Sequence, residues 1–529
     1  MNWLLTAIVL LPALGAVVLM LAPGRAAKMI AAAFTLATFL LSLWLYFGLV
    51  FAGQPFGDVM HPAWYVNEPW INLTLPNNFH FQVNFALGTD GLSMPMIILN
   101  GLLSFLAVIS SWHVEQRVRF YMAMLLVLET GVMGVFASFD LFLFILFWEV
   151  ELIPMFLLIG IWGGARREYA AWKFLIYTLV GSSFTLAGIL FIYVHTGAST
   201  ALFSHFAATA PTITGSVPLF GLTLSLPLVL FLLLFAGFAV KIPAWPVHTW
   251  LPDAHTEAPT AVSVLLAGVL LKMGAYGLIR VCLGFVPHGA MEIAPILAIG
   301  AAINVLWGAG ASMVQQDMKK MIAYASVSHM GYVLLGVAGA AAATGAMRTG
   351  APLMTFREAA LTGATLQMFT HGLITGMLFF CVGVVYEKAH TRDIDVFGGI
   401  AERMPVESTL YTIACLASLG LPALAGFVAE YLVFTGTFAL LPIPTIFAAF
   451  GVVLTAGYLL WMLRRSFFGP LNRAWAWLTD ATPREAFPLV ALTLVILFVG
   501  IFPMPIVDLL KPSLHNILIS AIQPIVAVP

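Results

Sequence analysis

Long apolar runs, separated by short polar connections, recur along almost the whole chain. A helix needs about 20 mostly apolar residues to cross the hydrocarbon part of a membrane. The runs therefore predict an all-α integral membrane protein with about fourteen transmembrane helices. Their approximate ranges are 3–23, 28–51, 88–111, 120–137, 139–162, 172–195, 223–247, 259–282, 289–313, 319–343, 359–386, 406–438, 442–464 and 486–510. The first run lacks a basic segment and a cleavage site, so we expect it to be retained.

The basic residues support this count, because they fall mainly on alternate connections. Sixteen of the 22 Lys and Arg residues lie in odd-numbered connections, whereas the even-numbered ones keep only Arg280, Arg348, Arg357 and Lys511. Inner loops of membrane proteins carry the excess of Lys and Arg. We therefore expect both termini on the outer side, and we expect the connection 52–86, which has no Lys or Arg, to cover the outer face.

Two of the predicted spans contain helix-breaking residues. Pro243 and Pro246 interrupt the seventh span, and Gly420, Pro422 and Gly426 interrupt the twelfth. Broken helices are tolerated in membranes where they line protein cavities or water. The two breaks lie five spans apart, which predicts two five-helix repeats, spans 4–8 and 9–13. Because each repeat has an odd number of spans, the second is inverted relative to the first.

This scheme divides the chain into four regions. Residues 1–111 form three N-terminal spans with the outer loop 52–86, and residues 112–282 form the first repeat. The second, inverted repeat is 283–464, and an inner loop with the last span occupies 465–529. In this arrangement we expect Lys241 and Glu430 to be equivalent positions, one beside each broken helix.

Composition excludes several classes of function. Apolar residues make up 61% of the chain and charged residues 9%, whereas about a quarter of a soluble domain is charged. The net charge of −1 argues against nucleic acid as a partner. Cys282, Cys381 and Cys415 lie in apolar stretches without metal-ligand spacing, and three thiolates are too few for an iron–sulfur cluster. We expect no metal or cofactor in this chain.

A few ionisable residues fall inside the predicted spans. A charge at the bilayer centre costs roughly 2.5–3.5 kcal/mol on insertion scales, so each needs a partner, water or a function. Six residues are our candidates for proton translocation: Glu149, Lys241, Lys272, His329, His371 and Glu430.

Each candidate also has a purely structural interpretation. Glu149 and Lys241 could form a static salt bridge that only neutralises two buried charges, or an ion pair whose strength changes during transport. A neighbouring carboxylate would then decide whether the lysine holds its proton. Lys272, His329 and His371 could equally be polar cross-links between helices.

Glu151 and Glu129 are weaker candidates. Glu149 and Glu151 are two residues apart, which places them about 200° apart around a helix. Both side chains therefore cannot face one cavity, and we expect Glu151 to be peripheral. Glu129 fits a structural role better than a functional one.

Four stretches of the chain resemble a known family. They are FALGTDGLSM from Phe85, LFLFILFWEVELIPMF from Leu141, VKIPAWPVHTWLPDAHTEAPTAVSVLLAGVLLKMGAYGLIR from Val240, and MKKMIAYASVSHMGYVLLG from Met318. They resemble the antiporter-like membrane subunits of respiratory complex I, NADH:quinone oxidoreductase. The segment YEKAHTRDIDVFGGI from Tyr386, together with the acidic Glu430, resembles the M-type chain in particular.

The resemblance implies a role for each candidate. Glu149 would pair with Lys241, and Lys272 would belong to a central hydrophilic axis. His329 and His371 would continue that axis to Glu430, the acidic group of a second half-channel.

The resemblance also implies partners and cofactors. The chain would move protons while other subunits oxidise NADH and reduce quinone, using FMN and iron–sulfur clusters that lie outside this chain. Its partners would be lipids and the L-type and N-type antiporter-like chains, in a bacterial inner membrane. The alternative is a subunit of a multisubunit Na⁺/H⁺ antiporter or of a membrane-bound hydrogenase, because those relatives share the stretch from Val240.

Overall fold

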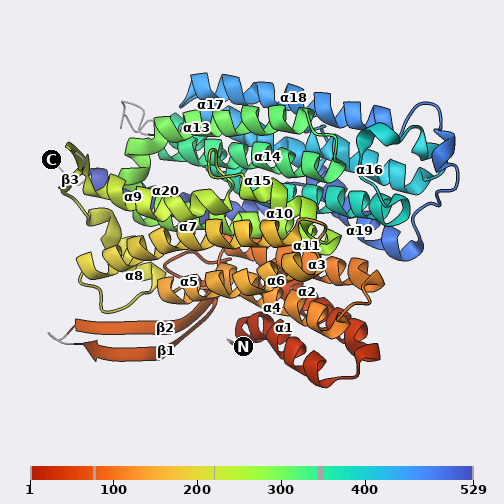
Figure 1. Cartoon of the computed structure of the whole chain (residues 1–529). Coiled ribbons are helices and arrows are strands. Elements are labelled where there is room, and N and C mark those ends of the chain that lie inside the picture. Colours follow the sequence, from red (N-terminus) through yellow and green to blue (C-terminus); the bar gives the residue numbers. More distant parts are fainter. Residues whose placement is uncertain (1–2, 76–78, 220, 343–350, 527–529) are drawn as a thin grey trace.

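The computed structural model describes residues 3–75, 79–219, 221–342 and 351–526. Twelve helices in these residues are long and apolar enough to cross a membrane. Figure 1 shows the long helices lying side by side in one bundle, with a strand hairpin projecting from one end. The predicted helical membrane fold is confirmed.

The fifth predicted span consists of two helices that meet at Glu151. Asp140 caps the first of them, since its carboxylate accepts hydrogen bonds from the backbone N–H groups of Phe142 and Leu143. The helices of this part of the chain are α1 (Leu4–Leu21), α2 (Ala27–Ala52), α3 (Ser93–Ser110), α4 (Val118–Ala137), α5 (Leu141–Val150), α6 (Leu152–Trp162), α7 (Arg167–His195) and the short α8 (Phe203–Thr209).

Both predicted breaks are present. The seventh span is divided into α9 (Leu226–Lys241) and α10 (Trp250–Glu257), and the twelfth into α16 (Pro405–Ser418) and α17 (Ala425–Phe438). The eighth span, called span 8 below, alternates α-helix with wide π-helical turns. Its parts are α11 (Thr260–Leu265), the π-helix η5 (Leu266–Leu270), α12 (Leu271–Gly277) and the π-helix η6 (Leu278–Leu283).

The most buried helices occupy the middle of the bundle. They are span 8, α14 (Met318–Ala341) and α15 (Ala351–Ala389). Peripheral helices such as α1 and α18 (Pro442–Ser466) instead expose apolar side chains, among them Leu14, Val17 and Val453. Such faces suit contact with lipid. Polar groups on the central helices are therefore shielded from the surrounding membrane by protein. The remaining long helices are α13 (Pro287–Met313), α19 (Pro483–Ile501) and α20 (Met504–Val526).

The connection predicted as a cover is a β-hairpin, which the all-helical prediction missed. Strand β1 (Ala63–Leu75) pairs antiparallel with β2 (Phe79–Thr89). The backbone N–H of Phe139 donates to the carbonyl of Ala86, which docks the hairpin on the bundle. We call this the hairpin end of the bundle (Figure 1). A second small hairpin, β3 (Ser216–Leu219) and β4 (Leu222–Ser225), precedes α9.

The end of the chain also differs from the prediction. The last predicted span, 486–510, is not one helix, because α19 stops at Ile501 and α20 begins at Met504. Pro503 and Pro505 lie at this junction, and proline removes a helical hydrogen bond and clashes with the preceding turn. α20 then packs against α15 in the middle of the bundle.

Candidate functional site

The first part of the site forms where the seventh span breaks. α9 ends at Lys241, and Pro243 and Pro246 separate it from Trp250, where α10 begins. The negative end of the helix dipole favours a cation at this terminus. Span 8 approaches closely here at Gly274, since a Cβ on that residue would lie 2.9 Å from the Cβ of Lys241.

The ammonium group of Lys241 is buried and donates to Oε1 of Glu151. The predicted pairing of Lys241 with Glu149 is therefore wrong, and so is the peripheral position expected for Glu151. The two carboxylates do point in different directions, but it is Glu151 that faces α9. Glu149 is partly exposed and lies close enough to repel Glu151 electrostatically.

Aromatic rings surround the rest of this ion pair. Nζ of Lys241 lies 5.3 Å from the ring centroid of Trp148 and 5.7 Å from that of Phe174, and such ring faces attract a cation. The second oxygen of Glu151, Oε2, has no hydrogen-bond partner among the described residues. One acceptor of the carboxylate is thus free to take a proton or a water molecule.

The second part of the site is Lys272, which is fully buried between the two π-helical segments of span 8. Its Nζ donates to the carbonyl oxygen of Ala267 and lies 2.7 Å from Nδ1 of His371 on α15. Wide π-turns occur frequently at functional sites in membrane and soluble proteins. Lys272 therefore points toward the second repeat through His371.

A row of contacts continues from His371 to the second broken helix. The ring centroids of His371 and His329 are 5.7 Å apart. On its far side, Nδ1 of His329 lies 3.4 Å from Oε1 of Glu430, and Nε2 lies 3.1 Å from the hydroxyl of Ser418. Gly420 has a φ of 76° at the break, and a Cβ there would lie 2.8 Å from Oε2 of Glu430.

Four of the six predicted residues thus form one row, which we call the Lys–His–His–Glu row: Lys272, His371, His329 and Glu430. A cavity of about 10 Å³ lies along it, lined by His329, His371, Ser418 and Glu430. That volume is about the minimum for one water molecule, and the site offers the polar partners that a buried water requires. The row is therefore compact, with room for little water.

The predicted equivalence of Lys241 and Glu430 is wrong in detail. Lys241 is the last residue of α9, before the break, whereas Glu430 lies inside α17, after the break. The two broken helices still place an ionisable group beside each interruption. A pattern of breaks in the sequence shows that two helices are interrupted, but it does not show which half of each carries the charge.

The sequence reasoning missed several buried basic residues, among them His255 and Lys319. His255 on α10 is fully buried, stacks on Phe379 with ring centroids 4.6 Å apart, and has no hydrogen-bond partner for either nitrogen among the described residues. Lys319 is buried at the start of α14 and donates to the carbonyl of Ala258. His255 lies three residues after Pro252, in the stretch that follows the broken seventh span, and that position was the available signal.

Other buried groups lie outside this row. Both carboxylate oxygens of Glu129 lack a partner among the described residues, and the same is true of Glu407 on α16. In the part of the chain that the structure describes, no group of three or more His, Cys, Asp or Glu residues is arranged to hold a metal ion. The three cysteines are buried and unpaired.

Comparison with known proteins identifies the family. Residues 138–455 match the sequence model of the family described as NADH:quinone oxidoreductase/Mrp antiporter, TM. The chain belongs to this family. A relative, NADH-quinone oxidoreductase subunit M of Rhodobacter capsulatus, is 40% identical over 98% of this chain and 96% of its own length.

Solved structures agree with membership of the NADH:quinone oxidoreductase/Mrp antiporter family. A chain of respiratory complex I from Thermus thermophilus with bound NADH superposes with a TM-score of 0.83, at 28% identity, over 98% of this chain and 99% of that one. A chain of the Mrp complex from Dietzia superposes with a TM-score of 0.79 over 99% of this chain and 100% of that one. Its identity is only 18%, so it shows the shared fold alone.

Proposed function

We propose that this chain is a proton-translocating membrane subunit of an NADH:quinone oxidoreductase. The observation that carries the proposal is the Lys–His–His–Glu row, an unbroken buried series of ionisable groups from Lys272 to Glu430. The identity to the Rhodobacter capsulatus subunit M supports the kind of complex. FMN, iron–sulfur clusters and the quinone site belong to other subunits, and no redox chemistry takes place in this chain.

Protons move along the row by changes of charge at neighbouring atoms. Nζ of Lys272 gives a proton to Nδ1 of His371, and a water molecule in the cavity along the row or a ring rotation passes a proton on to His329. His329 then gives it to Oε1 of Glu430 through Nδ1. Histidine suits this task because its charge changes near neutral pH at little energetic cost.

Lys241 is the switch that starts the transfer. Its ammonium is held by Glu151 in this structure, and Glu149, two residues earlier, is a second carboxylate at the junction of α5 and α6. Because Glu149 acts electrostatically on Glu151, a change of charge at Glu149 alters how strongly Glu151 holds Lys241. Gly274, which packs on Lys241, lies two residues from Lys272 on span 8. A charge change at the first broken helix is thereby transmitted to the row.

The partners and location follow from the same proposal. L-type and N-type antiporter-like chains are the neighbours in the membrane. Glu149, being partly exposed, lies where a neighbouring chain can act on it. The membrane is a bacterial inner membrane, and both termini lie on its outer side.

Glu430 provides the direct test. In the complex purified from its host and reconstituted in vesicles, Glu430→Ala is expected to lose most NADH-driven proton uptake because the row loses its last acceptor. Glu430→Lys is expected to retain more, since it keeps a titratable group. Assembly is checked on native gels, and NADH oxidation is measured in parallel.

Glu407→Gln is the matched control, because it alters a buried, unpartnered glutamate on the other half of the same broken helix. It is expected to pump normally. Wild-type pumping by Glu430→Ala would show that the row does not carry the protons. Sodium-dependent proton uptake that persists without NADH would instead favour a Na⁺/H⁺ antiporter, since the family description also names the Mrp antiporter.

A further inference from the structure

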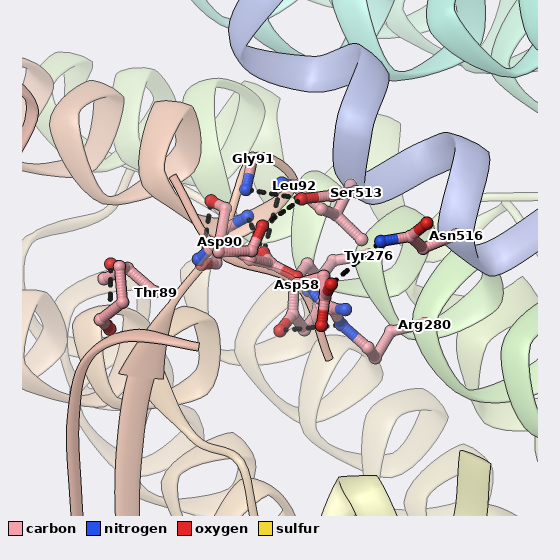
Figure 2. A network of polar contacts seen from close by, with 12 residues as sticks. Asp58, Thr89, Asp90, Gly91, Leu92, Tyr276, Arg280, Ser513 and Asn516 are labelled. Carbon is pink, nitrogen blue, oxygen red and sulfur yellow. Dashed lines mark hydrogen bonds and ion pairs between the residues drawn. The ribbon is translucent and has the colours of Figure 1, made fainter. Parts of the chain in front are cut away.

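A second buried ion pair joins span 8 to the start of α3, away from the Lys–His–His–Glu row. Arg280 and Asp90 are both buried, and Nη2 of Arg280 donates to Oδ2 of Asp90 (Figure 2). Arg280 lies two turns beyond Lys272 toward the hairpin end, about 12 Å along the helix axis at 1.5 Å per residue. Tyr276 occupies the turn between them, and Nε of Arg280 lies 3.3 Å from its hydroxyl.

Arg280 is held by several contacts, but one of its donor nitrogens has no hydrogen-bond partner among the described residues. Asp90 is itself fixed at the start of α3, because Oδ1 accepts the backbone N–H groups of Leu92 and Ser93. The guanidinium also lies 5.5 Å from the ring centroid of Phe139 and 5.3 Å from that of Tyr276. Its Nη1 has no hydrogen-bond partner among the described residues.

The last helix locks this pair in place. The backbone N–H of Gly91, next to Asp90, donates to Oγ of Ser513 on α20 at 2.8 Å, and that hydroxyl donates to the carbonyl of Gly57. One turn further along α20, the amide of Asn516 donates to Asp58 (Figure 2). A Cβ on Gly91 would lie 2.1 Å from the carbonyl oxygen of Leu509, so α20 could not pack so closely on any larger residue.

A layer of packed aromatic rings separates Arg280 from Lys272. Tyr276 contacts Phe136 and Phe144, with ring centroids 5.5 and 6.2 Å apart, and Phe144 also contacts Phe238 at 6.5 Å. These side chains are all fully buried. The hydroxyl of Tyr276 is the polar side-chain group of these four residues and lies beside Nε of Arg280, so a proton that crossed the layer there would pass next to the guanidinium.

We propose that the Asp90–Arg280 pair is an electrostatic barrier that stops protons from passing directly from Lys272 to the hairpin end. The guanidinium keeps its positive charge under all physiological conditions, and a fixed buried cation repels protons and other cations that approach it. Protons that reach Lys272 are thereby directed sideways to His371. The inference rests on the proposed function of Lys272. It assigns a role to Arg280, a residue of span 8 that does not itself carry protons.

Passive proton flux tests the barrier without turnover. Vesicles that contain the purified complex receive no NADH, a potassium diffusion potential is imposed with valinomycin, and an internal pH dye reports proton entry. The variant Asp90→Asn/Arg280→Met removes both charges together, which avoids leaving one buried charge unpaired. Its passive flux is expected to rise several-fold above that of the wild type.

The matched control removes another Asp–Arg pair that also caps a helix. Asp317 caps α14 and lies 3.1 Å from Nε of Arg392, and Asp317→Asn/Arg392→Met is expected to stay as tight as the wild type. Adding Lys272→Met to the leaky variant is expected to close it again, because the leak passes through Lys272. A leak that Lys272→Met leaves unchanged would indicate damage to packing and would overturn the proposal.

Two further results would also overturn it. One is wild-type passive flux in an assembled Asp90→Asn/Arg280→Met complex. The other is a raised passive proton flux in Arg280→Lys, which keeps the positive charge and is expected to match the wild type. This variant provides the test if the double variant does not assemble. These fluxes are measured without pumping, so failure of the barrier is distinct from normal pumping by Glu430→Ala, which would refute the row.

Discussion

Replacing Glu151 with glutamine removes the carboxylate to which Lys241 donates, while changing the side-chain volume very little. The two groups are almost completely buried, with exposed side-chain fractions of 1% for Lys241 and 0% for Glu151. Breaking such a pair by removing one partner leaves an uncompensated buried charge and costs about 3–5 kcal/mol. We therefore expect Glu151→Gln to lower both the thermal stability of the complex and its proton pumping.

Glu149→Gln is the matched comparison. It makes the same chemical change two residues earlier in the chain and leaves the Lys241–Glu151 contact intact. We expect it to reduce NADH-driven proton uptake but to leave stability unchanged. Stability is measured by thermal unfolding of the purified complex, and pumping by dye quenching in vesicles. Equal loss of stability in the two variants, or wild-type behaviour of Glu151→Gln, would refute the assignment of Glu151 as the partner of Lys241.

Two other expectations concern packing and pH. Gly274→Ala places a Cβ 2.9 Å from both the Cβ of Lys241 and the carbonyl oxygen of Phe238. We expect this overpacking to lower the stability of the fold by about 1–3 kcal/mol and to reduce proton pumping. The control Gly300→Ala, where nothing lies within 4 Å of the added Cβ, should change neither stability nor pumping. Burial raises the pKa of Asp140, at the base of the hairpin, from 3.8 to about 6. A carboxyl whose folded-state pKa is raised contributes stability that is complete below pH 3.8 and is lost as the pH rises through 6, to the extent of about 3 kcal/mol. The backbone N–H of Asn84 in β2 donates to Oδ2 of Asp140, so hydrogen exchange in β2, corrected for intrinsic rates, should be faster at pH 8 than at pH 5. Equal protection at the two pH values would show that burial does not raise the pKa of Asp140.

The spans and their interruptions were predictable because they depend on local sequence. Twenty apolar residues can only cross the membrane as a helix, and Pro243 or Pro422 breaks a helix wherever it occurs. The alternation of Phe81, Val83 and Phe85 with polar residues is also typical of a strand, so the hairpin was predictable although the all-helical prediction missed it.

The partner of Lys241 was not predictable in the same way. Periodicity places Glu149 and Glu151 on different faces of one helix, but the sequence does not show which face meets α9. That choice depends on the packing of α5 and α6 against the other helices. The network around Asp90 poses the same difficulty, because Ser513 lies 422 residues away from Gly91.

The wide turns on either side of Lys272 give span 8 a freedom that a regular helix lacks. A π-turn contains one extra residue, and it can migrate along a helix by exchanging one backbone hydrogen bond at a time. Each step rotates the residues it passes by about 100°. Migration of η5 (Leu266–Leu270) past Lys272 would thus swing its ammonium group away from His371 without unfolding the helix. Span 8 is therefore a helix in which Lys272 can face two directions in turn.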